Sequence, residues 1–324
     1  MNPNDNLRRN GNILIAIGPA DMTSRSGGAP VPVSASSTNS SLLSEFRPSL
    51  IMGAALIVSG LVHLALLWFT GASWEGAMSL RKPGLFGVSA GVTVWSIAWV
   101  LTQLKPFRHD HSLATLMSAG LLLEVGLITM QHWRGVPSHF NRSTPLDAAV
   151  ESVMLGLILG VTVSIIWLCV RSRQLRPMLE SQAIAIRAGL WLLLISCGLG
   201  FMTTIMGEVN LANGRSPEIW GCGGVLKYPH GAALHAIQTL PLLATLLQKL
   251  RVSHAEWHLR AAIASQVLFL THALWQTLCG RARMDVDVIG GTTLATAGLL
   301  LLSPLAAIAW GTVASAVEFR RAFK

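Results

Sequence analysis

Hydrophobic segments, each about as long as a membrane-spanning helix, follow one another along most of the chain with short polar turns between them. A helix of about 20 apolar residues crosses the hydrocarbon core of a bilayer. The pattern predicts an all-α, polytopic transmembrane helix bundle of about eight spans within 49–318. We place the spans near 49–71, 84–104, 113–133, 149–170, 183–206, 231–250, 261–280 and 292–316.

The two ends of the chain lack this pattern. Residues 1–48 are rich in Asn, Ser, Gly and Pro, which predicts a disordered polar tail. An alternative is that translation begins at Met22 and the tail is shorter. Residues 319–324 form a second short polar tail.

The composition supports lipid as the solvent of this chain. Hydrophobic residues make up 52% and charged residues 12%, against about 25% charged residues in an ordinary soluble domain. The net charge of +9 could suggest nucleic acid as a partner. We exclude nucleic acid because the Lys and Arg residues stand singly or in pairs at the ends of the predicted spans, as insertion topology requires.

The distribution of positive charge predicts the orientation. With the N-terminus inside, 15 Lys and Arg residues fall in cytoplasmic segments and 8 in outer loops. The positive-inside rule therefore places both termini in the cytoplasm of a bacterial inner (plasma) membrane. The two long connections, 134–148 and 207–230, then face outward, where functional loops are common.

Ionisable residues inside the spans are the candidates for chemistry, because each costs free energy unless it is paired or useful. They include His63, Glu124, His235 and His272. His63 and His272 lie roughly 12 Å below the outer boundary at ~1.5 Å per residue, and Glu124 falls at a similar depth. His235 lies about one turn in. Their shared outer layer predicts that the four side chains converge on one cavity.

Three kinds of group could occupy such a cavity. Haem b needs axial imidazoles on opposite sides, and His63, His235 and His272 could supply them. A divalent metal would take His with a carboxylate from Glu124 or Asp147. A quinone would fit beside His235 and Gln238, which share a helix face at i, i+3. The alternative without any cofactor is that these histidines hydrogen-bond between helices.

The outer loops add further candidates. Thr144 can cap a helix that Pro145 begins, and this capping would account for Asp147. His230 is about 140° from His235 around a continuous helix, so one metal would not take both, and we place His230 in a loop over the cavity. The outer-loop candidates for ligand contact are His132, Arg134, His139, Asn141, Asp147 and His230.

Three segments resemble a family of bacterial multi-pass membrane proteins for which no activity is established. They are RKPGLFGVS (81–89), E…QHWRGVPSHFN…TPLD (124–147) and YPHGAALHAIQTLPLL (228–243). RGxxSHFN with TPxD is the most specific part. The resemblance covers roughly 80–245 and implies a membrane protein but no reaction; His63 and His272 lie outside it.

Smaller features complete the predictions. The pairs Gly87/Gly91 and Gly156/Gly160 have the spacing that lets helices approach closely. Pro241 should kink the sixth span. Cys222 and Cys279 would both lie on the oxidising side of the membrane. They could form a disulfide with each other or remain two free thiols.

These residues leave the class of activity, and whether the chain is an enzyme, open. The leading hypothesis is a redox or cofactor protein that holds haem b or a metal and exchanges electrons with a quinone or a protein partner. The alternative is a transporter or channel in which the same residues line a substrate or proton path. A membrane-embedded metal hydrolase with Glu124 or Asp147 as base ranks third.

Overall fold

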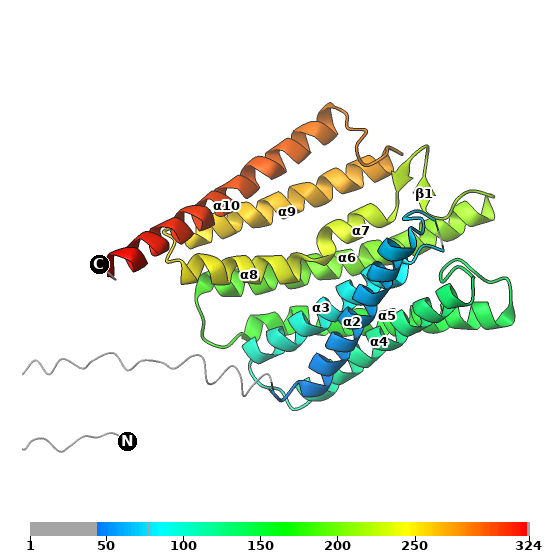
Figure 1. Cartoon of the computed structure of the whole chain (residues 1–324), viewed down its shortest axis with the longest axis horizontal. Coiled ribbons are helices and arrows are strands. Elements are labelled where there is room, and N and C mark those ends of the chain that lie inside the picture. Colours follow the sequence, from blue (N-terminus) through cyan, green and yellow to red (C-terminus); the bar gives the residue numbers. More distant parts are fainter. Residues whose placement is uncertain (1–43, 77, 323–324) are drawn as a thin grey trace, which may run out of the picture.

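The computed structural model describes residues 44–76 and 78–322, with only the backbone described for 315–322. Most of the predicted tail 1–48, including Met22, lies outside the described residues, as do the last two residues of the tail 319–324. The helices run roughly side by side in Figure 1, except that α2 crosses its neighbours at a steeper angle. They are α2 (Arg47–Thr70), α3 (Arg81–Gln103), α4 (Asp110–Trp133), α5 (Pro145–Arg171), α6 (Glu180–Ala212), α7 (Lys227–Leu234), α8 (Ala236–Lys249), α9 (Ala255–Leu278) and α10 (Val288–Ala322).

The predicted all-α fold is confirmed. In the described part of the chain, six helices are long and apolar enough to cross a membrane, with mean hydropathies from 1.7 to 2.6. They are α2, α3, α4, α5 with the following 3-10 turn η1 (Ser172–Gln174), α6 and α10. The chain is thus a multi-pass α-helical protein whose environment is a lipid bilayer.

Two predicted spans differ from the expectation. The sixth is not one helix but two, because α7 ends at Leu234 and α8 begins at Ala236. The seventh corresponds to α9, which is 24 residues long but carries Glu256, Arg260 and several other polar residues, so it falls outside the apolar set. The eight-span count stays a prediction.

The helices form two packed groups that share α6. One hydrophobic cluster joins α2, α3, α4 and α5 to α6, and a second joins α6 to α7, α8 and α9. Figure 1 shows the first group and the second on opposite sides of α6, with α10 against α9 at the outer edge of the second. Outside α6, the two groups meet where α3 contacts α8.

Glycines set the packing of α2 on α3. A Cβ atom added at Gly87 would lie 2.8 Å from the Gly60 Cα, so the two backbones touch there, as the Gly87/Gly91 spacing predicted. The same prediction is wrong for Gly156 and Gly160, because a Cβ at either would meet nothing within 4 Å. Both glycines are exposed, on a face of α5 that none of the described helices approaches closely.

One end of the bundle is tied together by its loops, and we call it the clasp end. The backbone N–H of Lys105 donates to Gln174 O (2.9 Å), and that of Arg176 donates to Gln103 O (2.8 Å). Arg171 forms a buried ion pair with Asp110 and donates to Lys105 O (2.6 Å). These bonds join the α3–α4 connection to the α5–α6 connection.

The opposite end holds the two long connections. After α6, the chain forms a short antiparallel hairpin, β1 (Ile219–Trp220) and β2 (Gly224–Val225), and enters α7 directly. The connection 134–144 lies at this same end. Its Phe140 ring packs directly against Gly207 near the end of α6, where there is no room for a larger residue. We call this the seam end, because it is the end nearer to the polar contact between the helix groups that is described below.

Candidate functional site

The sixth span is interrupted at His235, whose backbone stands between α7 and α8 with φ −93° and ψ 8°. Two carbonyls near the end of α7 accept hydrogen bonds, one from a side chain and one from the capping N–H. Gln266 of α9 donates to Ala232 O, and the His235 N–H donates to Ala233 O. Because an unpaired carbonyl within a bilayer is costly, these contacts make the interruption sustainable.

Polar side chains from the interruption face α3. Gln238 Nε2 donates to Thr93 Oγ1 at 3.2 Å, and His235 Nε2 lies 3.4 Å from Ser89 Oγ. His235 and Gln238 therefore share a face, as their spacing predicted, and Ser89 and Thr93 are one turn apart on α3. We call these four residues the polar seam.

The polar seam is incompletely satisfied. Gln238 Oε1 is buried and accepts no hydrogen bond from the residues that the structure describes, although an unpaired buried acceptor costs roughly 1–3 kcal/mol. His235, at the other edge of the seam, is exposed. Ionisable groups at membrane depth normally face a bundle interior or a hydrated cavity. The seam is thus a polar, under-bonded contact between the two helix groups.

His230 continues this polar region toward α6. The His230 ring faces Gly200, where an added Cβ would come within 3.2 Å of Nδ1. Its Nδ1 donates to Ser196 O at 2.8 Å, and Ser196 Oγ donates to His230 O at 2.8 Å. His230 therefore lies in α7 and not in a loop, which corrects our prediction, and it is close enough to His235 for electrostatic interaction.

Glu124 is buried in α4 at 7% exposure. Within the described part of the chain it forms neither a hydrogen bond nor an ion pair. It lies within electrostatic reach of Cys197, the residue that follows Ser196 in α6. Ser196, which bonds His230, and Cys197, which lies near Glu124, are neighbours in α6.

The other two predicted residues have different surroundings. His63 accepts a hydrogen bond from Trp133 Nε1 (3.2 Å) and its Nδ1 lies 2.7 Å from Ser59 O. His272 is fully buried, and its Nδ1 donates to Gly290 O at 2.9 Å. These partners show different surroundings for His63 and His272, because equal depth leaves the position around the bundle undetermined; a single cavity for all four residues stays a prediction.

The arrangement fits the predicted cofactors poorly. Among the described residues, no group of three or more His, Cys, Asp or Glu side chains could hold a metal ion. Both ring nitrogens of His63 already have partners, so this imidazole is not available as an axial haem ligand without rearrangement. His272 Nε2 is buried without a partner, but it lies beside Tyr228 and Phe269, away from His63.

In the connection 134–148, most of the predicted site residues form hydrogen bonds within the connection and to the adjoining helix ends. Asp147 accepts hydrogen bonds from Arg134 (2.7 Å), Gln131 (3.0 Å) and Thr144 (2.6 Å). The Thr144 hydroxyl also accepts from the Asp147 N–H at 3.1 Å, which is the predicted helix cap. Asn141 bridges Pro137 O and Ser143. We assign Arg134, Asn141 and Asp147 a positioning role.

His139 points from this connection to α3 and α7. Its ring is 6.0 Å from that of Phe86. Burial, and to a smaller extent the nearby charges of Lys82 and Lys227, lower the pKa of His139 to about 3. The imidazole is therefore neutral at physiological pH and can accept a hydrogen bond.

Lys82 is the residue that our sequence reasoning missed here. It lines a crevice too narrow for a water molecule together with Pro83, Ile128, His132, Val136 and Ser138. Glu218, an acidic group that acts on Lys82 electrostatically, forms an ion pair with Lys227 at 2.8 Å. The only signal for Lys82 in the sequence was its place in the segment 81–89. That segment, 124–147 and 228–243 all meet at the seam end.

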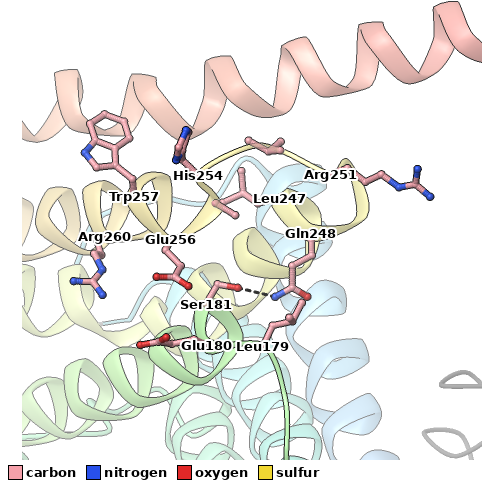
Figure 2. Close-up of a pocket in the computed structure, with 12 residues that line it drawn as sticks. Leu179, Glu180, Ser181, Leu247, Gln248, Arg251, His254, Glu256, Trp257 and Arg260 are labelled. Carbon is pink, nitrogen blue, oxygen red and sulfur yellow. Dashed lines mark hydrogen bonds between the residues drawn. The ribbon is translucent and has the colours of Figure 1, made fainter. Parts of the chain in front are cut away.

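A cavity lies at the clasp end, away from the polar seam. It measures about 760 Å³ and lies between the start of α6, the end of α8 and the start of α9. In Figure 2, Glu180 and Glu256 approach it from α6 and α9, and Gln248 Nε2 donates to Ser181 Oγ at 2.9 Å. It contains none of the predicted site residues.

Comparison with known proteins assigns neither a family nor an activity to this chain. No family model matches the chain, and no curated protein or solved structure matches it either. The class is therefore defined by the fold and the site alone: a multi-pass helical membrane protein with a discontinuous helix at a polar contact between two helix groups.

Proposed function

We propose that this chain is a proton-translocating membrane transport protein, in which the discontinuous span α7–α8 moves against α3. The interruption at His235, directly at the polar seam, is the observation that carries the proposal. Discontinuous helices whose ends present polar groups near the membrane interior are typical of transporters, where the binding site lies between two moving parts.

The ionisable residues supply a path for protons. His235 and His230 lie within electrostatic reach of each other, and Ser196 and Cys197 of α6 separate His230 from Glu124. A carboxyl group without a partner inside a membrane is expensive, and it is a functional candidate for that reason. Imidazole and carboxyl side chains are the usual members of intramembrane proton relays.

The packing of the two helix groups supports a moving part. Contacts between α3 and α8 are few, and the polar seam holds an acceptor without a donor in Gln238 Oε1. Such a contact can separate and re-form at low cost, unlike the backbone contact between Gly60 and Gly87 on the other face of α3. With both termini in the cytoplasm, as the charge pattern predicts, the seam opens outward.

Proton flux in liposomes tests the proposal. Purified protein is reconstituted into vesicles that contain a pH-sensitive dye, and a valinomycin-mediated potassium gradient drives protons inward. We expect faster acidification than in empty vesicles, and a reduction of at least about ten-fold for Glu124→Gln. His63→Gln is the matched control, because His63 is also an intramembrane histidine but lies away from the seam.

Infrared spectroscopy gives a second measurement that needs no transported solute. A pH step should change the carboxyl band of a protonated acid in the wild type, and Glu124→Gln should lack that change. Flux equal to that of empty vesicles, together with no carboxyl band assigned to Glu124, would refute the proposed function.

A further inference from the structure

The turn of the β1–β2 hairpin packs against the end of α9. The Gly223 N–H donates to Gly280 O at 2.7 Å. A Cβ added at Gly221 would lie 2.9 Å from the Gly280 Cα, and one added at Gly280 would lie 3.2 Å from the Cys222 nitrogen. Two segments that are far apart in the sequence therefore touch through their backbones.

Each side of this contact carries an exposed cysteine. Cys222 lies within the hairpin turn, and Cys279 precedes Gly280 at the end of α9; both thiols are free and exposed. Standard bond lengths limit the separation of the two Cα atoms to about 10 Å, and a disulfide needs at most about 7 Å. A shift of a few ångströms in the turn is enough.

The glycines around the contact permit that shift. Gly221 and Gly280 have φ of +61° and +67°, conformations that favour glycine. Gly223 and Gly224 complete a turn with little side-chain bulk between the two thiols. We infer that Cys222 and Cys279 form a reversible disulfide that fixes the hairpin to α9.

The chemistry is a thiol–disulfide exchange with a low-molecular-weight disulfide as oxidant. One cysteine thiolate attacks a sulfur of that disulfide, forms a mixed disulfide and releases one thiol. The second cysteine thiolate then attacks the protein sulfur, closes the Cys222–Cys279 bond and releases a second thiol. The protein loses two protons and two electrons, and the oxidant takes up both.

The bridge would restrain the start of α7. Val225 ends the hairpin, and α7 begins two residues later at Lys227, which pairs with Glu218 of the same connection. Thr277 of α9 already donates to Val225 O at 3.1 Å. The formation of the disulfide does not depend on the proposed function. An effect of the disulfide on proton flux, in contrast, rests on the proposed function.

Mass spectrometry under non-reducing conditions tests the disulfide. The probe is the full-length protein in a Cys169→Ser/Cys197→Ser background, treated with oxidised glutathione and then alkylated. We expect a Cys222–Cys279 linked peptide, loss of alkylation at both thiols together, and recovery of both after reduction. In the matched variant Cys222→Ser, Cys279 should carry only glutathione or the alkylating group.

The outcomes separate the disulfide from the proposed function. Both thiols remaining alkylated after oxidation would overturn the inference, and so would linked dimers on a non-reducing gel in place of the internal link. If the bridge forms but oxidised and reduced wild-type protein, with Cys197 in place, move protons equally, the disulfide stands and the restraint on α7 is wrong. If the bridge is absent and Glu124→Gln still lowers flux, only the proposed function stands.

Discussion

The clasp end and the seam end of the same bundle are built differently. At the clasp end, the guanidinium of Arg171 is buried against Asp110 and Lys105 O, and backbone hydrogen bonds join the two neighbouring connections. Farther from the clasp, about midway along α3, Gln238 keeps a buried oxygen that accepts from none of the described residues, and His235 stands at a helix interruption. Paired polar groups stabilise a structure, whereas a buried group without a partner costs free energy, a property that Gln238 Oε1 shares with Ser49 Oγ and Thr115 Oγ1 near the clasp.

Removal of Arg171 is expected to have the largest effect. Arg171→Ala leaves the Asp110 carboxylate buried and unpaired, which costs about 3–5 kcal/mol in the free energy of unfolding. Thermal or detergent-titrated unfolding of the purified protein measures this loss. Arg142→Ala is the control, because Arg142 is 60% exposed in its pair with Glu151 and should change stability by less than about 1 kcal/mol. Equal losses would contradict the idea of a clasp.

A second substitution tests the rigid face of α3. Gly87→Leu forces a side chain into the backbone contact with Gly60, so we expect a loss of about 1–3 kcal/mol or more and a lower yield of folded protein. Gly156→Leu is the control, because it makes the same substitution on an exposed face of α5, and we expect it to be tolerated. Size-exclusion chromatography and thermal unfolding compare the two. A stable Gly87→Leu variant would show that the α2–α3 contact is adjustable.

The pH dependence of stability tests His139 at the seam end. Because its folded-state pKa of about 3 lies below the ordinary value, the unfolded chain binds a proton that the folded chain does not. Stability should therefore fall as the pH drops below about 6.5, by up to ~1.4 kcal/mol per pH unit for this one proton. His139→Gln should show a shallower fall between pH 6 and 4, measured by thermal unfolding. If wild type and His139→Gln lose stability equally with falling pH, the His139 imidazole is in contact with water and its pKa is not lowered by burial.

The smallest expected change in stability is at Gln238. Gln238→Leu removes the unpaired acceptor, and Thr93 keeps its own bond to Ser89 O at 2.8 Å. We expect stability within about 1 kcal/mol of the wild type, or slightly higher, together with slower proton flux. A large loss of stability would show that the polar seam is a structural contact and not a moving one.

The sequence predicted most of the helices and less of the site. The long apolar runs place α2 to α6 and α10 correctly, because lipid imposes a length and a composition on a spanning helix. Depth along a helix is also readable, but the side of the bundle that a residue faces is not. His63 and Glu124 were therefore assigned to one cavity although they have different neighbours. His235 and Gln238 were grouped correctly because they are close in the sequence.

Lys82 and the interruption of the sixth span show what sequence alone missed. Lys82 looks like an ordinary charge at a helix end until the connections 134–144 and 213–226 pack around it. Pro241 predicted a distortion of its helix, but the interruption lies six residues earlier, where Gln266 and Ser196 provide hydrogen bonds from helices distant in the sequence. Such partners are set by tertiary packing.

Backbone hydrogen exchange in liposomes tests the central difference between the two ends most directly. Amides of α7 and of the interruption at 235–238 should exchange at least about ten-fold faster than those at 103–110 and 171–176 of the clasp. The end of α9, residues 266–278, is the control at the same end of the bundle and should remain protected. Equal protection of α7, α9 and the clasp would contradict a moving span and leave the interruption as a static feature of the fold.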